Sequence, residues 1–143
     1  MAVLHYRKTK VQYNSHNKAD KKVLACGFCD AGVSERSVHE TDTVIVIPNR
    51  VSYDMFEGRR VTEHLMVIPK QHRESFIDFS QQEQLETMQV IAKYEAEGYN
   101  IYARGVGSIS RSMKHQHTHL IKLSQRASNA VFYIKRPYFL LDI

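Results

Sequence analysis

The stretch His115-Gln116-His117-Thr118-His119-Leu120-Ile121 carries three of the chain's eight histidines at alternate positions. Side chains two residues apart share one face of a β-strand, whereas on a helix the middle histidine would point away from the other two. Threonine and isoleucine are also typical strand residues. The spacing therefore predicts a strand within residues 113–123 whose three imidazoles line one surface. Such a row is typical of a catalytic site, of three ligands to one metal, or of a histidine-rich surface strand.

Short apolar runs on both sides of this stretch predict the other strands. We expect a hairpin from residues 37–40 and 43–47 that ends at Pro48, a polar irregular segment at 51–62 and a buried strand at 63–69. After a helix, strands are expected at 99–103 and 130–134, separated by a glycine-rich loop at 105–110 and the histidine stretch. The fold class is therefore α+β, with a mainly antiparallel sheet of about five strands.

One long helix is predicted after Ser80, because Ser80-Gln81-Gln82-Glu83 matches the capping box of a helix N-terminus. Gly98 marks its end. Apolar residues recur at helical spacing, and we expect this stripe to face the core: Leu85, Met88, Ile91, Ala92 and Ala96.

Length and composition are those of one ordinary domain: 143 residues, 43% hydrophobic and 24% charged. No apolar run approaches the roughly 20 residues of a membrane helix, and the N-terminus lacks the apolar core of a signal peptide. Two cysteines are too few for a disulfide framework. We therefore expect a cytoplasmic protein that does not associate with membranes.

The net charge of +5 belongs to the first 22 residues, which hold six Lys or Arg against one Asp. We expect residues 1–22 to form a basic, flexible arm ahead of a domain at residues 23–143. The arm is typical either of a solvated extension or of a segment that binds nucleic acid.

Four motifs in a fixed order resemble those of the histidine triad (HIT) family of nucleotide hydrolases and transferases, and in particular its zinc-containing bacterial members. The triad matches the family pattern of three histidines separated by single residues. The other motifs, taken from the N-terminus, are Cys26-Gly27-Phe28-Cys29, Asn49-Arg50 and Glu63-His64-Leu65-Met66-Val67-Ile68-Pro69. The resemblance covers residues 23–123 and implies a HIT-like fold with a shorter helical segment beside the long helix.

The resemblance implies that His117 is the nucleophile and that His119 and His64 stabilise charge on the phosphate. A neutral imidazole suits this role because its pKa lies near neutrality. Asn49 would hold the ribose hydroxyls, and Ser112 would bind the phosphate. Arg111 and Arg104 would add charge for a polyphosphate chain, unless they are solvated loop arginines.

Cys26 and Cys29 have the spacing of a zinc knuckle, although this spacing is also found in redox pairs. In zinc-containing HIT proteins two histidines complete the site, and here these would be His72 and His115. Four protein ligands leave no open position, so the implied zinc is structural.

Some positions depart from the family pattern. Gln116 and Thr118 stand where the family has apolar residues, and residues 54–60 look like an insertion beside the nucleotide pocket. The resemblance implies a homodimer that acts on dinucleoside polyphosphates or nucleoside phosphoramidates. Two alternatives remain: a regulatory nucleotide-binding module with weak catalysis, and an enzyme that processes nucleic-acid ends guided by the basic arm.

Overall fold

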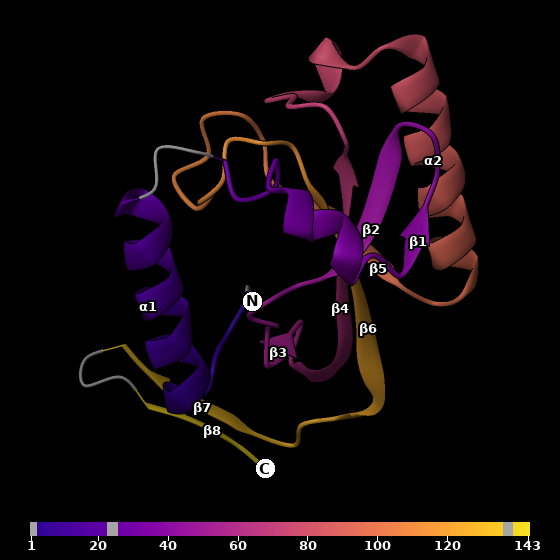
Figure 1. The fold of residues 1–143 in the computed structure, drawn as a ribbon. Helices are drawn as coiled ribbons and strands as arrows, with labels where there is room; N and C mark the ends of the chain where they lie inside the picture. The colour runs from indigo at the N-terminus through magenta and orange to yellow at the C-terminus, as the bar shows by residue number, and fades with distance from the viewer. Residues whose placement is uncertain (1–2, 23–25, 136–138) are drawn as a thin grey trace.

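A six-stranded antiparallel sheet forms the centre of the molecule, in the order β1-β2-β4-β6-β5, with β3 paired to the outer part of β4. The computed structural model describes residues 3–22, 26–135 and 139–143 (Figure 1). The strands are β1 (His39–Glu40), β2 (Val44–Pro48), β3 (Met55–Phe56), β4 (Arg59–Pro69), β5 (Asn100–Ala103) and β6 (Thr118–Ala127). A separate two-stranded sheet joins β7 (Val131–Ile134) to β8 (Phe139–Asp142). The helices are α1 (Arg7–Lys22) and α2 (Gln81–Ala96), with 3-10 turns η1 (Ala31–Arg36) and η2 (Phe76–Asp78).

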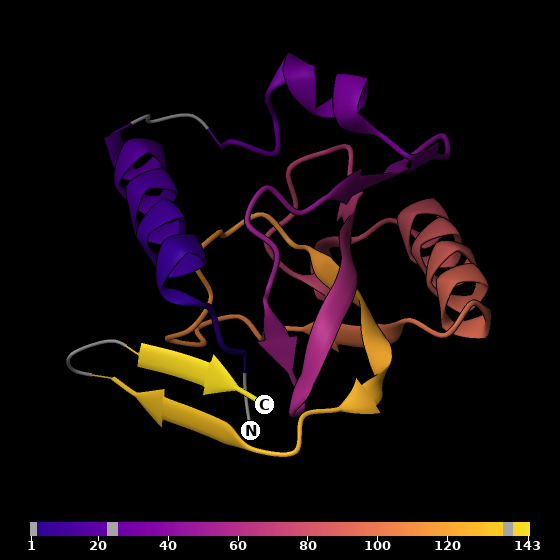
Figure 2. The same cartoon turned by 90° about the horizontal axis from the view of Figure 1, so that it is seen from below.

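The two faces of the sheet have different covers, because side chains alternate along each strand. On one face α2 packs Val90 and Tyr94 against the row that includes Leu65 and Leu120. On the other face Val33 of η1 packs on the row that includes Met66. Figures 1 and 2 show η1 and α1 on the side of the sheet away from α2. The expected α+β architecture is confirmed, with a sixth strand in the sheet.

The helix predicted after Ser80 is confirmed, including its capping box, but the predicted core face of α2 is wrong. Leu85 and Met88 are 55% and 63% exposed, and both alanines of the stripe are also exposed. The buried face instead includes Glu86, whose carboxylate accepts hydrogen bonds from Thr41 and Thr43. Polar contacts to the β1–β2 turn therefore decide which face of the helix meets the sheet.

The predicted strand through the triad begins later than expected. β6 starts at Thr118, so only His119 lies within the strand, while the two preceding histidines lie in the irregular segment that leads into it. All three side chains are buried rather than arranged on an open surface. Gln116 is buried as well, and its backbone N–H donates to the carbonyl of Arg73.

The segment 51–62 is more regular than expected. β3 and the start of β4 form a hairpin in which Met55 pairs with Arg60 and Phe56 pairs with Arg59. Its two-residue loop, Glu57-Gly58, has positive φ values of 51° and 72° at both positions. This is the backbone conformation that tight hairpin loops require, and it explains the glycine.

The N-terminal segment is helical from Arg7 to Lys22, where we had expected a flexible arm. Leu4 forms a β-bridge with Met55 and packs in a small core with Leu140 of β8. The segment is thus connected both to the β3–β4 hairpin and to the β7–β8 hairpin. Among the described residues, no helix is long and apolar enough to cross a membrane.

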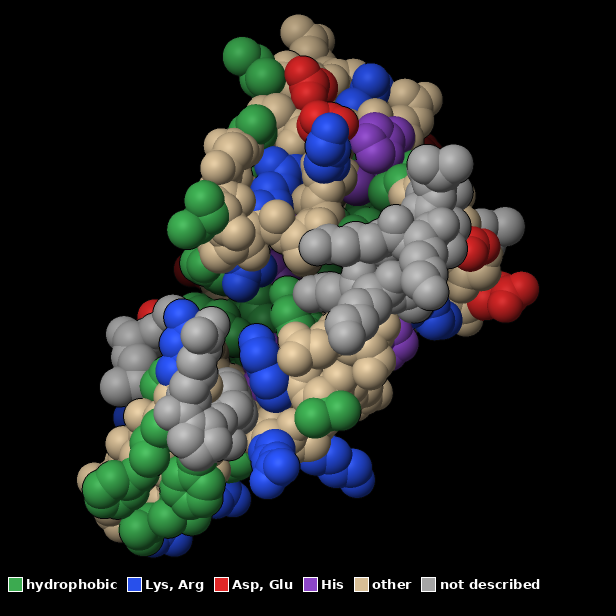
Figure 3. Space-filling view, turned by 90° about the vertical axis from the view of Figure 1, so that its left-hand side faces the viewer, with side chains coloured by type: hydrophobic (Ala, Val, Ile, Leu, Met, Phe, Trp, Pro, Cys, Tyr) green, Lys and Arg blue, Asp and Glu red, His purple; other side chains and the backbone are tan. Residues whose placement is uncertain are grey.

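The apolar residues at 132–134 and 138–141 predict a core or a subunit contact, and in the structure most of the described side chains there are exposed. Phe132 and Ile134 pair with Leu141 and Phe139, and all four side chains are exposed. Figure 3 shows these hydrophobic side chains gathered at the lower left. Tyr138, expected in the same group, lies outside the described residues.

Candidate functional site

Two central strands bring His64 and His119 together. His119 on β6 pairs with Met66 on β4. Because His64 lies two residues before Met66 on the same strand, the side chains of His64 and His119 share one face of the sheet. Their rings are 5.1 Å apart, and the ring of His117 is 5.0 Å from that of His119. The three histidines predicted to be catalytic therefore form one buried cluster.

Hydrogen bonds fix the tautomers of this pair. The backbone N–H of Tyr53 donates to Nδ1 of His64 at 3.1 Å, so the proton of this neutral ring lies on Nε2. That Nε2–H faces Nδ1 of His119 at 2.9 Å, which assigns the proton of His119 to its own Nε2. The Tyr53 hydroxyl lies 3.3 Å from this Nε2 and can accept its proton.

His117 is oriented by the backbone. Its Nδ1 lies 2.8 Å from the carbonyl oxygen of His115, and only a protonated Nδ1 can bond to a carbonyl. This bond leaves the lone pair on Nε2, the atom that would attack an electrophile. Phe28 contacts the ring edge-on, with the centroids 5.4 Å apart.

The electrostatics of the cluster favour neutral imidazoles. Burial, and after it the neighbouring His5 and Arg104, lowers the pKa of His64 to about 3. Burial and the neighbouring His64 lower the pKa of His119 to about 2. Burial also lowers the pKa of His117, although its bond to the carbonyl opposes this effect.

The positive charge in the cluster comes from Arg104. Its Nη1 lies 3.3 Å from Nε2 of His119, and its guanidinium carbon lies 5.9 Å and 5.3 Å from the ring centroids of Tyr53 and Tyr102. A guanidinium held against these neutral rings suits an anion, such as a phosphate oxygen.

The residues predicted to bind substrate have distinct surroundings. Asn49 lines the pocket, and its side-chain oxygen accepts the backbone N–H of Val51 at 3.1 Å. Ser112 also lines the pocket. Arg111 lines it too, but its guanidinium donates to the backbone carbonyls of Glu74, Met113 and Lys114. Arg111 therefore braces the loop ahead of the triad.

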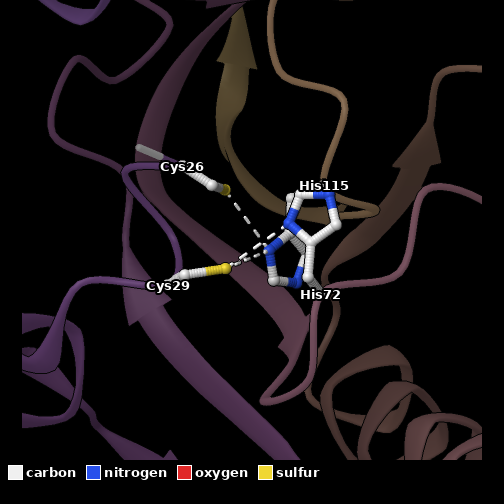
Figure 4. A group of neighbouring side chains, drawn as sticks. All are labelled: Cys26, Cys29, His72 and His115. Carbon is white, nitrogen blue, oxygen red and sulfur yellow. Dashed lines mark hydrogen bonds between the residues drawn. The ribbon is translucent and has the colours of Figure 1, made fainter. Parts of the chain in front are cut away.

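A second cluster contains Cys26, Cys29, His72 and His115, whose ligand atoms all lie within 4.8 Å of one another. Figure 4 shows the two thiols facing the two imidazoles. Nδ1 of His115 lies 3.5 Å from each sulfur, and Nδ1 of His72 lies 3.4 Å from that of Cys29. The four residues predicted as metal ligands thus come together from three separate segments and can hold a metal ion.

A pocket of about 680 Å³ opens beside His117 and His119. The N-terminal segment supplies part of its wall, including His5, which no motif marks. Tyr53 also lines the pocket and was likewise missed, because no motif marks it. Residues 54–60 do not line this pocket themselves, and Asp54 lies 3.7 Å from His5, which does. That they border the nucleotide site stays a prediction.

No family model matches the chain, and no curated protein matches it. Several solved structures do. A histidine triad protein from Clostridium difficile has a TM-score of 0.53 at 22% identity, covering 76% of this chain and 97% of that one. A HIT family protein from Bacillus anthracis scores 0.54 at 19% identity over 80% and 85% of the two chains. A HIT family hydrolase from Clostridium thermocellum scores 0.53 at 16% identity over 73% and 96%. The fold is therefore that of histidine triad proteins, as the motifs implied.

Proposed function

We propose that this protein is a hydrolase or transferase that cleaves nucleoside phosphate linkages through a covalent nucleotidyl-histidine. The observation that carries the proposal is the bond from Nδ1 of His117 to the carbonyl of His115, which leaves a lone pair on Nε2. That histidine lines a pocket whose wall also includes His119 and the Arg104 guanidinium. Nucleophile and phosphate-binding donors are the two requirements of nucleotidyl transfer.

In the first step Nε2 of His117 attacks phosphorus. The bond from phosphorus to the leaving group breaks, and its electron pair departs with the leaving group, which takes up a proton. The carbonyl of His115 accepts the Nδ1–H and so stabilises the positive charge that develops on the ring. In the second step water attacks phosphorus and gives up a proton, which balances the proton taken up by the leaving group. The phosphorus–nitrogen bond breaks, and its electron pair returns to Nε2.

The neighbouring residues stabilise the charge on the phosphate. Nε2–H of His119 and the Arg104 guanidinium would donate to the non-bridging oxygens, and Ser112 would add a hydroxyl donor. Asn49 would bind the ribose hydroxyls. The substrates that fit this reaction are dinucleoside polyphosphates and nucleoside phosphoramidates.

The Cys26, Cys29, His72 and His115 cluster fits a structural zinc ion. Tetrahedral zinc with ordinary bond lengths places sulfur and nitrogen ligands about 3.5 Å apart. Three of the four sulfur–nitrogen distances, at 3.4 to 3.5 Å, match this value. Nε2 of His115 lies 2.9 Å from the carbonyl of Pro69, which aims Nδ1 at the sulfurs. Bound zinc would hold the Cys26–Cys29 segment against the residue that orients the nucleophile.

A homodimer is the assembly that fits the exposed surface of α2 and β5. β5 is an edge strand, with β6 as its neighbour among the described residues. Ile101 on β5 is exposed, as are Leu85 and Met88 on α2. An apolar stripe beside an open strand edge is a typical protein interface.

The test is to trap the covalent intermediate. Wild-type protein is mixed with α-labelled diadenosine tetraphosphate or adenosine phosphoramidate and quenched within milliseconds. We expect acid-labile, base-stable label on the protein, and none on His117→Asn, which stays folded. His39→Asn, which lies on β1, is the control and should be labelled normally.

Retention of configuration at phosphorus is the second expected result, because two in-line displacements restore the original arrangement. Label that persists on His117→Asn, or inversion at phosphorus, would refute the two-step route. Nucleotide binding by the wild type without turnover of any of these substrates would instead establish the regulatory module.

A further inference from the structure

The N-terminal helix is fixed in place by Asp54, which caps it. The backbone N–H of Tyr6 donates to one carboxylate oxygen of Asp54 at 2.8 Å, and the hydroxyl of Thr9 donates to the other at 3.1 Å. Both groups lie at the positive end of the helix dipole, where a carboxylate is favourable. The hydroxyl of Tyr6 also bonds to Asp142 on β8. α1 is therefore held against the rest of the molecule by specific hydrogen bonds.

One face of α1 lines the pocket that contains His117. Lys10, Tyr13 and His16 are spaced three residues apart, so they lie along the same side of the helix, and all three line the cavity. Lys10 Nζ lies 5.1 Å from the Tyr13 ring centroid. The helix thus presents a cation, an aromatic ring and an imidazole to one ligand site.

The aromatic surface continues from α1 towards the histidine cluster. The ring of His5 stacks on Tyr13, with centroids 5.4 Å apart and an angle of 25°. The same ring meets Tyr53 edge-on at 5.7 Å, and Tyr53 lies 4.2 Å from His64. A planar base bound against Tyr13 would therefore remain within the same cavity as the reacting phosphorus.

The charge of the pocket exceeds what a single phosphate requires. Its wall includes Lys10, Arg36, Arg50 and Arg104. Among the described residues, no acidic side chain lies within 4 Å of these four cations, and none lines the pocket. A volume of about 680 Å³ lies in the upper half of the range for small-ligand sites, roughly 300–1,000 Å³.

We infer that Lys10, Tyr13 and His16 bind the leaving half of the substrate and select a leaving group that is itself a nucleotide. The inference rests on the proposed function. The anchors proposed for the transferred nucleotide, Asn49 and the histidine cluster, all come from the sheet and its loops. α1 forms another part of the wall, and its residue types match a phosphate and a nucleobase.

Two kinds of substrate release a nucleotide as the leaving group by the same chemistry. One is a dinucleoside polyphosphate, and the other is an adenylylated 5′ end of a nucleic acid. The experiment therefore compares three substrates: diadenosine tetraphosphate, a 5′-adenylylated oligonucleotide, and adenosine phosphoramidate, whose leaving group is ammonia. In Lys10→Ala and Tyr13→Ala, kcat/KM should fall about tenfold for a substrate with a nucleotide leaving group, relative to the phosphoramidate. The substrate that shows this loss identifies the source.

Matched controls are available on the same helix. Lys8 is exposed and does not line the pocket, so Lys8→Ala should keep the selectivity of the wild type. Tyr13→Phe keeps the ring and should restore most of the selectivity that Tyr13→Ala loses. Binding gives a second readout: in the His117→Asn background, Lys10→Ala should weaken diadenosine tetraphosphate about tenfold and leave AMP unchanged.

Equal loss on all three substrates would overturn the inference, because α1 would then bind the transferred half. Unchanged selectivity in both alanine variants would overturn it as well. The proposed function fails separately, when the wild type turns over none of the three substrates.

Discussion

At the scale of single residues, the histidines of the site are neutral, and the positive charge beside them lies on an arginine. Three imidazoles are buried, and their burial favours the neutral form of each ring. The permanent charge beside them belongs to Arg104, whose guanidinium cannot lose its proton. The histidines therefore provide oriented ring nitrogens, and the arginine attracts an anion.

Replacing Arg104 tests this division. In Arg104→Gln the affinity for AMP should fall by about tenfold, because a charge-assisted bond to phosphate is lost, while the affinity for adenosine should stay the same. Titration calorimetry with the two ligands measures the difference. Arg104→Lys keeps the charge and should recover part of the AMP affinity. A parallel loss for adenosine would mean that Arg104 supports the shape of the pocket and not the phosphate.

The neutral histidines also make stability depend on pH. An unfolded histidine takes up a proton below about pH 6.5, whereas His64, with a folded pKa of about 3, stays neutral. The unfolded state then binds more protons, so stability is full above pH 6.5 and falls as the pH drops towards the folded pKa. Each such ring lowers the free energy of unfolding by about 1.4 kcal/mol per pH unit in this window.

Urea unfolding at pH 7.5 and pH 5.5 measures this loss. In His64→Gln the loss on acidification should be smaller than in the wild type by about 1.4 kcal/mol. The metal cluster and the other buried histidines are common to both proteins, so the difference isolates His64. Identical losses in the two proteins would show that His64 takes up a proton in the folded state.

At the scale of elements, local patterns predicted those whose signals lie within a few residues. The capping box at Ser80 and the apolar run ending at Pro69 both gave the expected helix and strand. The buried face of α2 was missed, because the stripe of Leu85 and Met88 carries no sign of what covers it. Glu86 decides the orientation through threonines about 45 residues away. The helix α1 was missed for the same reason, because Asp54, which caps it, is distant in sequence.

The candidate site was predictable where a motif marks it. The spacing of the triad and of the two cysteines, together with the family pattern, named residues that the fold does bring together. His5 and Tyr53 carry no motif, and only the packing of α1 and of the loop after β2 brings them to the pocket. The late start of β6 was also hidden, because alternating histidines suit a strand and the extended segment before one.

The zinc site that includes the Cys26–Cys29 segment can be tested directly by measuring the metal content of the protein. Purified protein should contain about one zinc per chain, and Cys26→Ser or Cys29→Ser should lose zinc and thermal stability together. Turnover should fall as well, because His115 orients His117 through its carbonyl. Elemental analysis and a melting curve provide the readouts. His39→Ser removes a histidine outside the cluster and should keep its zinc; a metal-free wild type of unchanged stability would exclude a structural ion.

At the scale of the whole molecule, the exposed stripe on α2 predicts self-association. Light scattering should give the mass of a dimer, and Met88→Glu should shift it towards a monomer, because a charge would be buried in the interface. Val11→Glu changes an exposed apolar residue of α1 and should leave the dimer intact. A monomeric wild type, or a dimer that tolerates Met88→Glu, would mean that another surface is used.

The contacts that hold α1 in place have a consequence for folding during synthesis. Its anchors include Asp142, which lies 136 residues from Tyr6 along the chain, and Leu140, which packs on Leu4. During synthesis the helix leaves the ribosome early, whereas these partners emerge only after every strand of the central sheet. The order of folding is then the reverse of the order of synthesis for this wall of the pocket. This wall of the pocket can therefore be completed only after the β7–β8 hairpin has emerged.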